Sequence, residues 1–194
     1  MIADPKLVSQ LRERTGAGIV ECKNALDEAG GDIEKAIEVL RKKGEIKAAK
    51  KSAERTTKEG LVHAYIHANG KVGAMVEVSC ETDFVARNEE FQAFVHDLAM
   101  QVAATNPLYV KPEDIPAEIV AKEKEMYLEE VQGKPPAVIE KILEGKLQKY
   151  YSEVCFLKQS FVKDEDITIE ELINQKIAKI GEKIEVKRFV RFQI

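Results

Sequence analysis

The hydrophobic periodicity of this chain changes abruptly between residues 80 and 89. Before the change, apolar residues alternate with a period of two, which is typical of a strand with one buried face. These residues are Val72, Ala74, Val76 and Val78. After the change, apolar residues recur with a period near 3.6, which is typical of an amphipathic helix. These residues are Phe91, Phe94, Val95, Leu98 and Val102. The chain therefore combines strands with helices, which favours the α+β class.

The period changes at a short polar segment, residues 82–88 (TDFVARN), called the elbow below. Thr82 is expected to cap a first short helical turn. Asn88, followed by two glutamates, predicts the N-cap and acidic first turn of the long helix. A strand on one side and a helix on the other would hold Phe84 outward as a wedge. In the alternative, Phe84 packs into the core beside Phe91, because large aromatic side chains are mostly buried.

The composition describes a globular protein of one ordinary domain and a small second unit. The chain has 194 residues, of which 44% are hydrophobic and 33% charged, and its net charge of -4 does not favour nucleic acid as a direct partner. Its three cysteines are far apart, so we expect a reducing compartment and neither a disulfide framework nor a structural zinc site. No signal peptide and no apolar run of roughly 18 residues is present, so we expect a cytoplasmic protein without a membrane span.

The first 45 residues predict three short helices that form a compact bundle, residues 1–45. Asp4 and Pro5 are start signals for the first helix. Glycines at 16, 30 and 44 are expected to end the first, second and third helix. Each helix carries an apolar stripe at steps of three and four residues. The stripes consist of Leu7, Val8 and Leu11, then Ile19, Cys22, Ala25, Leu26 and Ala29, then Ile33, Ala36, Ile37 and Leu40.

A basic segment follows the bundle and is expected to form a helical linker, residues 46–59. Residues 41–51 hold six basic side chains and one acid, and alanines support helix propensity. The run is short and no aromatic residue interleaves with it as stacking on bases would require, which favours a solvated helix. The alternative is an RNA-binding or ribosome-associated protein that uses residues 42–51 as its contact.

The remainder, residues 60–194, predicts an α+β core. Two alternating segments, residues 61–67 and 72–80, flank an Asn-Gly pair at 69–70, which is a strong hairpin signal. Residues 184–194 are the last strand candidate and would complete a three-stranded antiparallel sheet packed with helices. Other helices are expected around residues 119–131, 139–150 and 169–180. Gly133 and two prolines are expected to end the first of these before the second begins. Residues 161–164 are expected to be extended.

Motifs for catalysis, metal binding or cofactor binding are missing from the sequence. Gly16 and Gly18 resemble a fragment of a dinucleotide loop, but no strand precedes them. Cys80 is a candidate nucleophile and Asp83 a candidate general base, but neither has a histidine nearby in sequence. Histidines 63 and 67 would lie roughly 13 Å apart on a strand and cannot share one ion unaided. We therefore expect no cofactor, no metal and no enzymatic activity, with an unrecognised enzyme as the alternative.

Four motifs together closely resemble the elongation factor Ts family, in the family's order and over nearly the whole chain. They are residues 12–18 (RERTGAG), 47–51 (KAAKK), 80–88 (CETDFVARN) and 188–192 (RFVRF). The resemblance implies that the N-terminal bundle is similar to ubiquitin-associated domains. It also implies a core that binds elongation factor Tu and acts as a guanine nucleotide exchange factor, promoting GDP release during translation elongation.

The same resemblance assigns roles to individual residues. In the elbow, Phe84 would be the wedge, Asp83 its polar companion, and Thr82 and Val85 the frame that aims them, so that the magnesium and phosphate site of elongation factor Tu is disturbed. A second contact is implied for three residues of the bundle, Arg12, Ile19 and Val20. For these the alternatives are that Ile19 belongs to the bundle core and that Arg12 is an ordinary solvated charge.

The length of the chain predicts its oligomeric state. Long members of the family have two core halves, whereas 194 residues with one hairpin and one elbow leave room for one. A single half would expose apolar surface, which commonly marks an association site. We therefore expect a homodimer and a 2:2 complex with elongation factor Tu. A further rival is a peptide-binding scaffold in which the bundle captures an amphipathic helix.

Overall fold

The computed structural model describes residues 4–131 and 135–194, without the side chains of residue 45 and residues 47–54. The chain divides into two compact units, each assembled from segments that are distant in sequence. The first unit comprises Met1–Gly60, Ser79–Arg87 and Glu171–Glu185. The second comprises Leu61–Val78, Asn88–Glu170 and Val186–Ile194. The elbow thus belongs to the first unit up to Arg87, and the helix that follows it belongs to the second.

The first unit contains the predicted N-terminal bundle. Its helices are α1 (Pro5–Thr15), α2 (Ile19–Glu28) and α3 (Ile33–Glu54). The Asp4 side chain accepts a hydrogen bond from the backbone N–H of Lys6 at 2.9 Å, and Gly16, at φ 68°, ends α1 in the left-handed region that glycine adopts readily. The apolar stripes meet in a core whose fully buried members are Leu11, Cys22, Ala25, Leu26 and Ala36. The three-helix bundle is confirmed.

The predicted end of the third helix at Gly44 is wrong, because α3 continues to Glu54. An isolated glycine costs a helix only about 1 kcal/mol relative to alanine, and the alanine, lysine and glutamate residues beyond it are strong helix formers. Gly44 also faces α8 (Ile169–Ile180), where a Cβ built on the glycine would lie 3.6 Å from the Cβ of Ala178. The side chains of the 47–51 motif lie outside the described residues.

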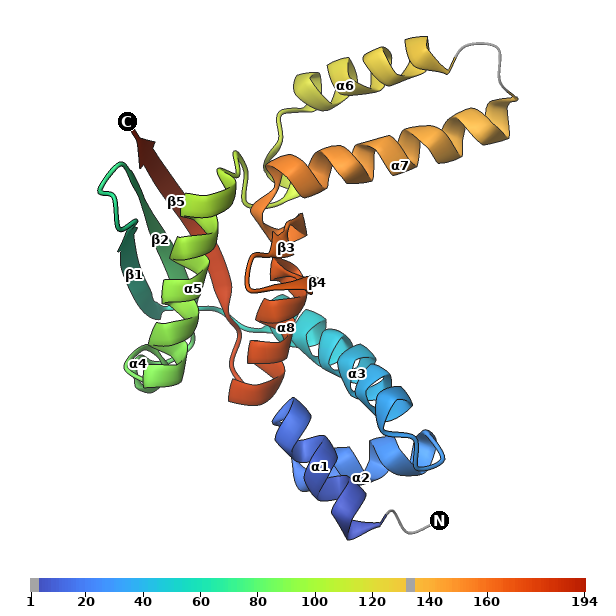
Figure 1. Ribbon diagram of the computed structural model, residues 1–194, viewed down its shortest axis with the longest axis vertical. Coiled ribbons are helices and arrows are strands. Elements are labelled where there is room, and N and C mark those ends of the chain that lie inside the picture. Colours follow the sequence, from blue (N-terminus) through green and yellow to red (C-terminus); the bar gives the residue numbers. More distant parts are fainter. Residues whose placement is uncertain (1–3, 132–134) are drawn as a thin grey trace. The chain divides into compact units, whose positions relative to one another are not determined.

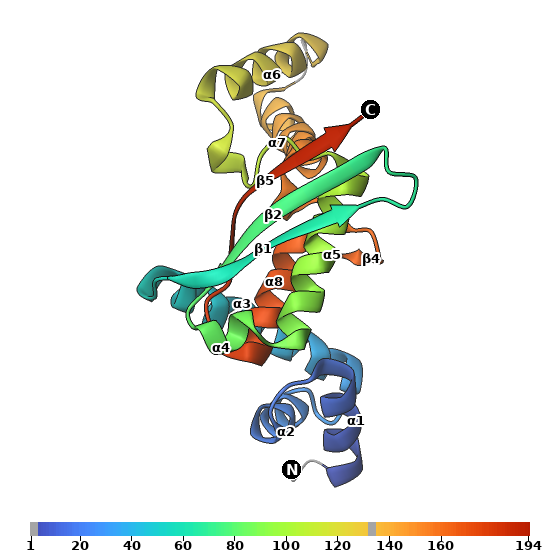
Figure 2. The same ribbon diagram turned by 90° about the vertical axis from the view of Figure 1, so that its left-hand side faces the viewer.

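The three-stranded antiparallel sheet is confirmed (Figure 2). Its strands are β1 (Glu59–Ile66), β2 (Val72–Cys80) and β5 (Glu185–Gln193), with β2 in the centre. Gly70, at φ 68°, forms the turn of the hairpin, and the N–H of His67 donates to the carbonyl of Val72 at 2.8 Å. Beside this turn, the N–H of Ile194 donates to the carbonyl of Lys71 at 3.0 Å, which sets the register of β5.

Helix α5 (Glu89–Thr105) covers one face of this sheet (Figure 1). Alternate residues of β2 and the apolar stripe of α5 form the core of the second unit, as the two periodicities predicted. Its buried members include Ala74, Val76, Val78, Phe91, Phe94, Val95, Leu98 and Val102. The Arg191 guanidinium of β5 donates to the carbonyl of Ala103 at 2.9 Å and links the strand to the helix end.

The second unit also contains a helical hairpin and a small second sheet. The hairpin consists of α6 (Ala117–Glu130) and α7 (Pro136–Val154), and the Lys146 ammonium lies 5.0 Å from the centre of the Tyr127 ring. The predicted stop at Gly133 lies outside the described residues. Strands β3 (Ser160–Phe161) and β4 (Asp164–Thr168) form a two-stranded antiparallel sheet where the sequence predicted only an extended segment.

A buried amide attaches this small sheet to α5. Gln101 is fully buried, its side-chain oxygen accepts from the N–H of Val162 at 2.9 Å, and its amide nitrogen donates to the carbonyl of Ser160 at 3.0 Å. In Gln101→Leu the N–H of Val162 and the carbonyl of Ser160 each lose this partner. We therefore expect the free energy of unfolding to fall by about 2 kcal/mol or more. Urea denaturation measures this, with Gln175→Leu at an exposed position of α8 as the control. Equal stability of the two variants would contradict the assigned role.

None of the helices within residues 4–131 and 135–194 is long and apolar enough to cross a membrane.

Candidate functional site

The elbow begins where β2 ends and contains one isolated helical turn. Thr82 has an extended backbone, at φ -127° and ψ 154°, and its hydroxyl oxygen accepts from the N–H of Val85 at 3.5 Å. The turn that follows is α4 (Asp83–Ala86). Asn88 then caps α5, because its side chain accepts from the N–H of Glu90 at 2.8 Å. Both predicted caps are confirmed.

The Phe84 side chain points into solvent. It is 82% exposed, whereas Phe91 is fully buried. The alternative in which Phe84 packs into the core beside Phe91 is therefore wrong. A ring exposed to this extent leaves a large apolar surface in water.

The other residues predicted for the elbow site are partly buried. Thr82, Asp83 and Val85 are each half-buried. The Asp83 carboxylate forms an ion pair of 3.2 Å with the Arg87 guanidinium one turn further along the chain. All four residues assigned to the elbow site are thus brought together on and beside α4, with Phe84 as the one that projects.

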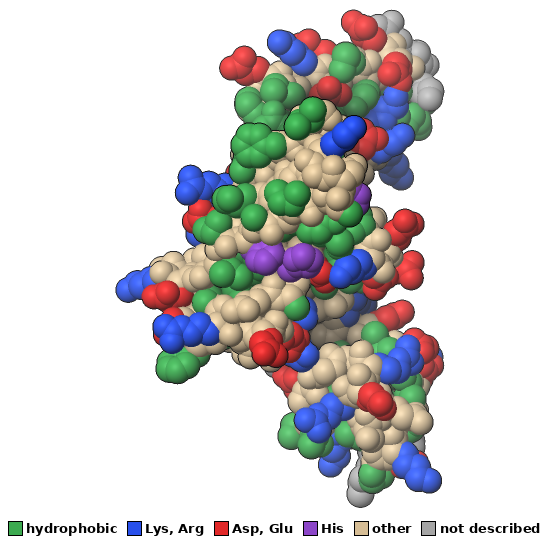
Figure 3. All heavy atoms as spheres, turned by 60° about the vertical axis from the view of Figure 1, so that its left-hand side comes forward, with side chains coloured by type: hydrophobic (Ala, Val, Ile, Leu, Met, Phe, Trp, Pro, Cys, Tyr) green, Lys and Arg blue, Asp and Glu red, His purple; other side chains and the backbone are tan. Residues whose placement is uncertain are grey.

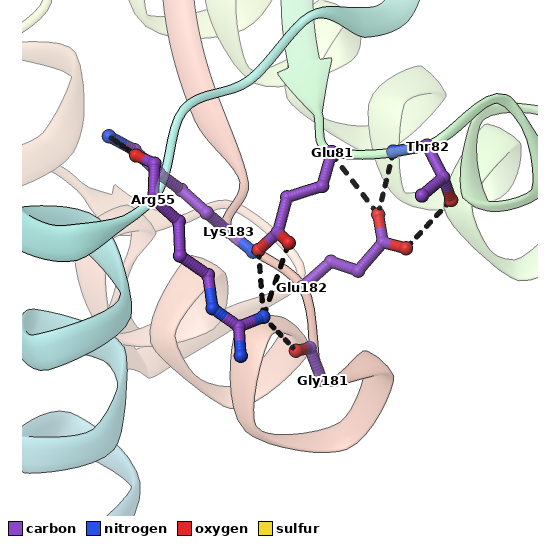
Figure 4. Close-up of polar contacts among 6 residues, drawn as sticks. All are labelled: Arg55, Glu81, Thr82, Gly181, Glu182 and Lys183. Carbon is purple, nitrogen blue, oxygen red and sulfur yellow. Dashed lines mark hydrogen bonds and ion pairs between the residues drawn. The ribbon is translucent and has the colours of Figure 1, made fainter.

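Glu182 is the residue of this site that the sequence did not reveal (Figure 4). One of its carboxylate oxygens accepts from the backbone N–H groups of Glu81 and Thr82, each at 3.1 Å. The other oxygen accepts from the Thr82 hydroxyl at 2.7 Å. Glu182 is 100 residues from Thr82 in sequence, and the only local signal was a polar residue directly after the helix-ending Gly181.

A second carboxylate, that of Glu81, holds the neighbouring chain segments together (Figure 4). It accepts from the Arg55 guanidinium at 3.1 and 3.2 Å and from the backbone N–H of Lys183 at 2.6 Å. The Lys183 ammonium in turn donates to the carbonyl of Arg55 at 3.1 Å. The residues that follow α3, β2 and α8 therefore meet at one polar corner beside the elbow.

Cys80 is not suited to act as a nucleophile. Its side chain is fully buried, and burial raises the pKa of the thiol to about 11. The sulfur also lies 3.2 Å from the carbonyl oxygen of Thr82, to which the S–H donates. Because the thiol stays protonated near neutral pH, the reactive thiolate is not available. Burial likewise raises the pKa of the Cys155 thiol to about 11.

The strand histidines have separate partners. His63 lies 3.0 Å from His96 of α5, measured between ring nitrogens, and His67 lies 3.1 Å from the Tyr65 hydroxyl. Burial, together with His96, lowers the pKa of His63. Within the described part of the chain, no group of three or more histidine, cysteine, aspartate or glutamate side chains is arranged to hold a metal ion.

The three bundle residues predicted to make a second contact lie on the surface. Arg12 is exposed on α1, and Ile19 and Val20, the first two residues of α2, are 59% and 69% exposed. The alternative that places Ile19 in the bundle core is wrong, because the core of α2 is formed by Cys22, Ala25 and Leu26. Ile19 and Val20 are thus two adjacent aliphatic side chains on the surface of the bundle.

Comparisons with known proteins give matches that include both the bundle and the elbow. The family model described as Elongation factor TS matches residues 8–194. The chain belongs to the elongation factor Ts family. The proteins named Elongation factor Ts from Moorella thermoacetica and Thermosipho melanesiensis are both 58% identical to it, over 189 and 191 residues. These alignments cover 96% and 97% of this chain, and 93% and 97% of the two relatives. The protein of that name from Thermotoga petrophila is 55% identical over 188 residues, which is 97% of this chain and 94% of the relative.

Membership of the elongation factor Ts family places the chain in translation elongation. The matched residues, 8–194, include the motif at residues 80–88. The structure adds Glu182 and Arg55 to the elbow, two residues that none of the four sequence motifs contains.

Proposed function

We propose that this protein binds elongation factor Tu and accelerates the release of GDP from it, as a guanine nucleotide exchange factor in the cytoplasm. The observation that carries the proposal is the Phe84 ring, 82% exposed on a one-turn helix that is capped and fixed at its base. Family membership supports the choice of partner. No cofactor and no direct contact with nucleic acid is part of the proposal.

The proposed mechanism is a competition between two binding partners. A GTPase holds its nucleotide through a phosphate loop, a magnesium ion and flanking switch segments. A partner that favours the conformation with these contacts broken weakens nucleotide binding by the same factor by which nucleotide weakens the partner. A thousandfold faster release through this weakening requires about 4 kcal/mol of coupling. Desolvated aromatic anchors contribute about 2 kcal/mol or more each.

The elbow residues supply this coupling in different ways. Phe84 inserts its ring between structural elements of the GTPase near the nucleotide. Asp83 brings a carboxylate beside the ring, where it disturbs the binding of the magnesium ion by the GTPase. Thr82 and Val85 fix the turn from which both side chains project.

The direct test is the rate at which labelled GDP leaves elongation factor Tu. Stopped-flow fluorescence of a GDP analogue bound to elongation factor Tu, mixed with excess GDP, measures this rate with and without the protein. We expect acceleration that saturates with protein concentration. Release rates that do not depend on the protein at micromolar concentration would contradict the proposed function.

The bundle is proposed to provide a second contact that adds affinity. In Val20→Ser we expect the concentration needed for half-maximal acceleration to rise about tenfold, because a buried aliphatic side chain contributes about 1.5 kcal/mol or more. The maximal release rate should stay the same, since the elbow is intact. Val138→Ser, at an exposed position of α7, is the matched control. Equal half-maximal concentrations in the two variants would remove the bundle from the interface.

We also propose that the protein is a homodimer that binds two molecules of elongation factor Tu. The face of the sheet opposite α5 supports this proposal, and hydrophobic side chains gather over the sheet in Figure 3. From the register of the strands, this open face carries Val62, Ala64, Ile66, Gly73, Met75, Glu77, Arg188, Val190 and Phe192. Five of its members are exposed large hydrophobic residues, namely Val62, Ile66, Met75, Val190 and Phe192.

The chemistry of the open face favours a second copy of the same chain as its occupant. Its only charged members, Glu77 and Arg188, bind each other at 2.6 Å and leave the rest of the face apolar. A contiguous apolar surface on a soluble protein commonly marks an association site. Two such sheets can pack face to face with their strands in alignment, and a two-fold axis lets the same patch serve both partners.

A further inference from the structure

The one-turn helix α4 needs support from outside its own sequence. A helix of four residues does not form by itself, because nucleation is unfavourable and the turn gains little from its own hydrogen bonds. Its internal cap is long, at 3.5 Å between the Thr82 hydroxyl oxygen and the N–H of Val85. The direction in which Phe84 points must therefore depend on groups that hold Thr82.

Glu182 is the group that holds Thr82. Its carboxylate accepts three hydrogen bonds, two from the consecutive backbone N–H groups of Glu81 and Thr82 and one from the Thr82 hydroxyl. Hydrogen bonds to a charged acceptor are roughly twice as strong as neutral ones. The side chain of Glu182 is half-buried, which limits competition from water.

The hydroxyl of Thr82 connects this carboxylate to the helix. Because it donates its proton to Glu182 at 2.7 Å, its oxygen lone pairs face the other way and are free to accept from Val85. The carboxylate thus sets the orientation of the N-cap, and the N-cap sets the start of α4. Phe84 is the second residue of that helix.

Glu182 itself occupies a fixed position. It follows Gly181, which ends α8 at φ 90°, and the carbonyl of Gly181 accepts from the Arg55 guanidinium at 3.4 Å. On its other side, the N–H of Lys183 donates to the Glu81 carboxylate at 2.6 Å. Both backbone neighbours of Glu182 are therefore held within the same polar corner.

We infer that Glu182 is a positioning residue for nucleotide exchange: its carboxylate orients Thr82 and the first turn of α4 so that Phe84 is presented to the partner GTPase. The effect of this positioning on nucleotide exchange rests on the proposed function. The positioning itself is a property of the free protein and can be measured without the partner.

The first test uses the free protein. Amide hydrogen exchange of Val85, Ala86 and Arg87, followed by NMR, should be about tenfold faster or more in Glu182→Ala, because loss of hydrogen bonds to a charged group costs more than a factor of ten in the opening equilibrium. Exchange in the centre of α5 should not change. Unchanged exchange at Val85 would overturn the inference whatever the partner does.

The conservative variant separates positioning from a general loss of charge. In Glu182→Gln the amide oxygen can accept from the two backbone N–H groups while the amide nitrogen donates to the Thr82 hydroxyl. We expect Glu182→Gln to recover most of the maximal GDP release rate that Glu182→Ala loses, about tenfold. Glu165→Ala, which removes an exposed glutamate from β4, controls for altered electrostatic attraction of the partner. Equal defects in Glu182→Gln and Glu182→Ala would overturn positioning through these bonds.

A double-mutant cycle with Phe84 completes the test. If Glu182 acts by presenting Phe84, then Glu182→Ala has no further effect on GDP release in the Phe84→Ala background. Independent, multiplying effects would overturn the inference. If the protein does not accelerate GDP release while Val85 exchange responds to Glu182→Ala, the proposed function fails and the positioning of α4 stands. Should Glu182→Ala not fold, Thr82→Val removes the hydroxyl bond to Glu182 and the cap to Val85 with little change in volume, and it should also speed exchange at Val85; unchanged exchange there would overturn the inference.

Discussion

Replacing Phe84 by alanine should reduce the maximal acceleration of GDP release from elongation factor Tu about 30-fold or more. The ring is 82% exposed in the free protein, so it makes few contacts there and is available to be buried on binding. Truncation of an aromatic anchor in the centre of an interface costs about 2 kcal/mol or more, which corresponds to a factor of about 30. The measurement is stopped-flow fluorescence of GDP release at saturating protein concentration.

The fold should not change in Phe84→Ala, because substitution of an exposed residue leaves no cavity and shifts stability by about 0.5 kcal/mol or less. Urea denaturation checks this. Leu108→Ala is the matched control, since Leu108 is also a large exposed hydrophobic residue, 63% exposed, and lies outside the elbow. A release rate within twofold of the wild type for Phe84→Ala, or an equal defect in Leu108→Ala, would show that the ring is not the wedge.

The elbow was accessible to sequence analysis because its signals are local. A change of hydrophobic period and two N-cap residues, Thr82 and Asn88, marked where one element ends and the next begins, and the structure confirms both caps. The orientation of Phe84 was not accessible in the same way. A one-turn helix is too short to show an amphipathic stripe, so the pattern excluded neither alternative, and the tendency of large aromatic side chains to be buried favoured the inward one.

The parts that the sequence did not reveal depend on contacts between distant segments. Glu182 reaches Thr82 across 100 residues, and no spacing rule connects them. Gly44 has the residue type of a helix stop, but it lies inside α3, where strong helix formers follow and α8 packs close by. The β3–β4 pair was missed because its turn, Val162 and Lys163, contains none of the usual turn residues.

A charge at the centre of the open sheet face should separate the proposed homodimer into monomers. Met75 lies on the central strand β2 and is 46% exposed, with Ala64 and Val190 beside it on the neighbouring strands. In Met75→Glu, a two-fold axis would bring a carboxylate from each copy into the same apolar interface. An unpaired buried charge costs about 3 kcal/mol or more, so the dimer dissociation constant should rise about 100-fold or more.

Sedimentation equilibrium distinguishes the two states directly. The wild-type protein at micromolar concentration should have twice the chain mass of 21.8 kDa, and Met75→Glu should have the mass of one chain. Met126→Glu makes the same substitution at an exposed methionine of α6, 51% exposed, and should remain dimeric. A dimeric Met75→Glu variant would place the interface elsewhere on the chain, and a monomeric wild type would rule out the 2:2 complex. Because Met75 lies outside the elbow, monomeric Met75→Glu should keep the exposed Phe84 ring, and its GDP release activity then tells whether exchange requires one copy of the chain or two.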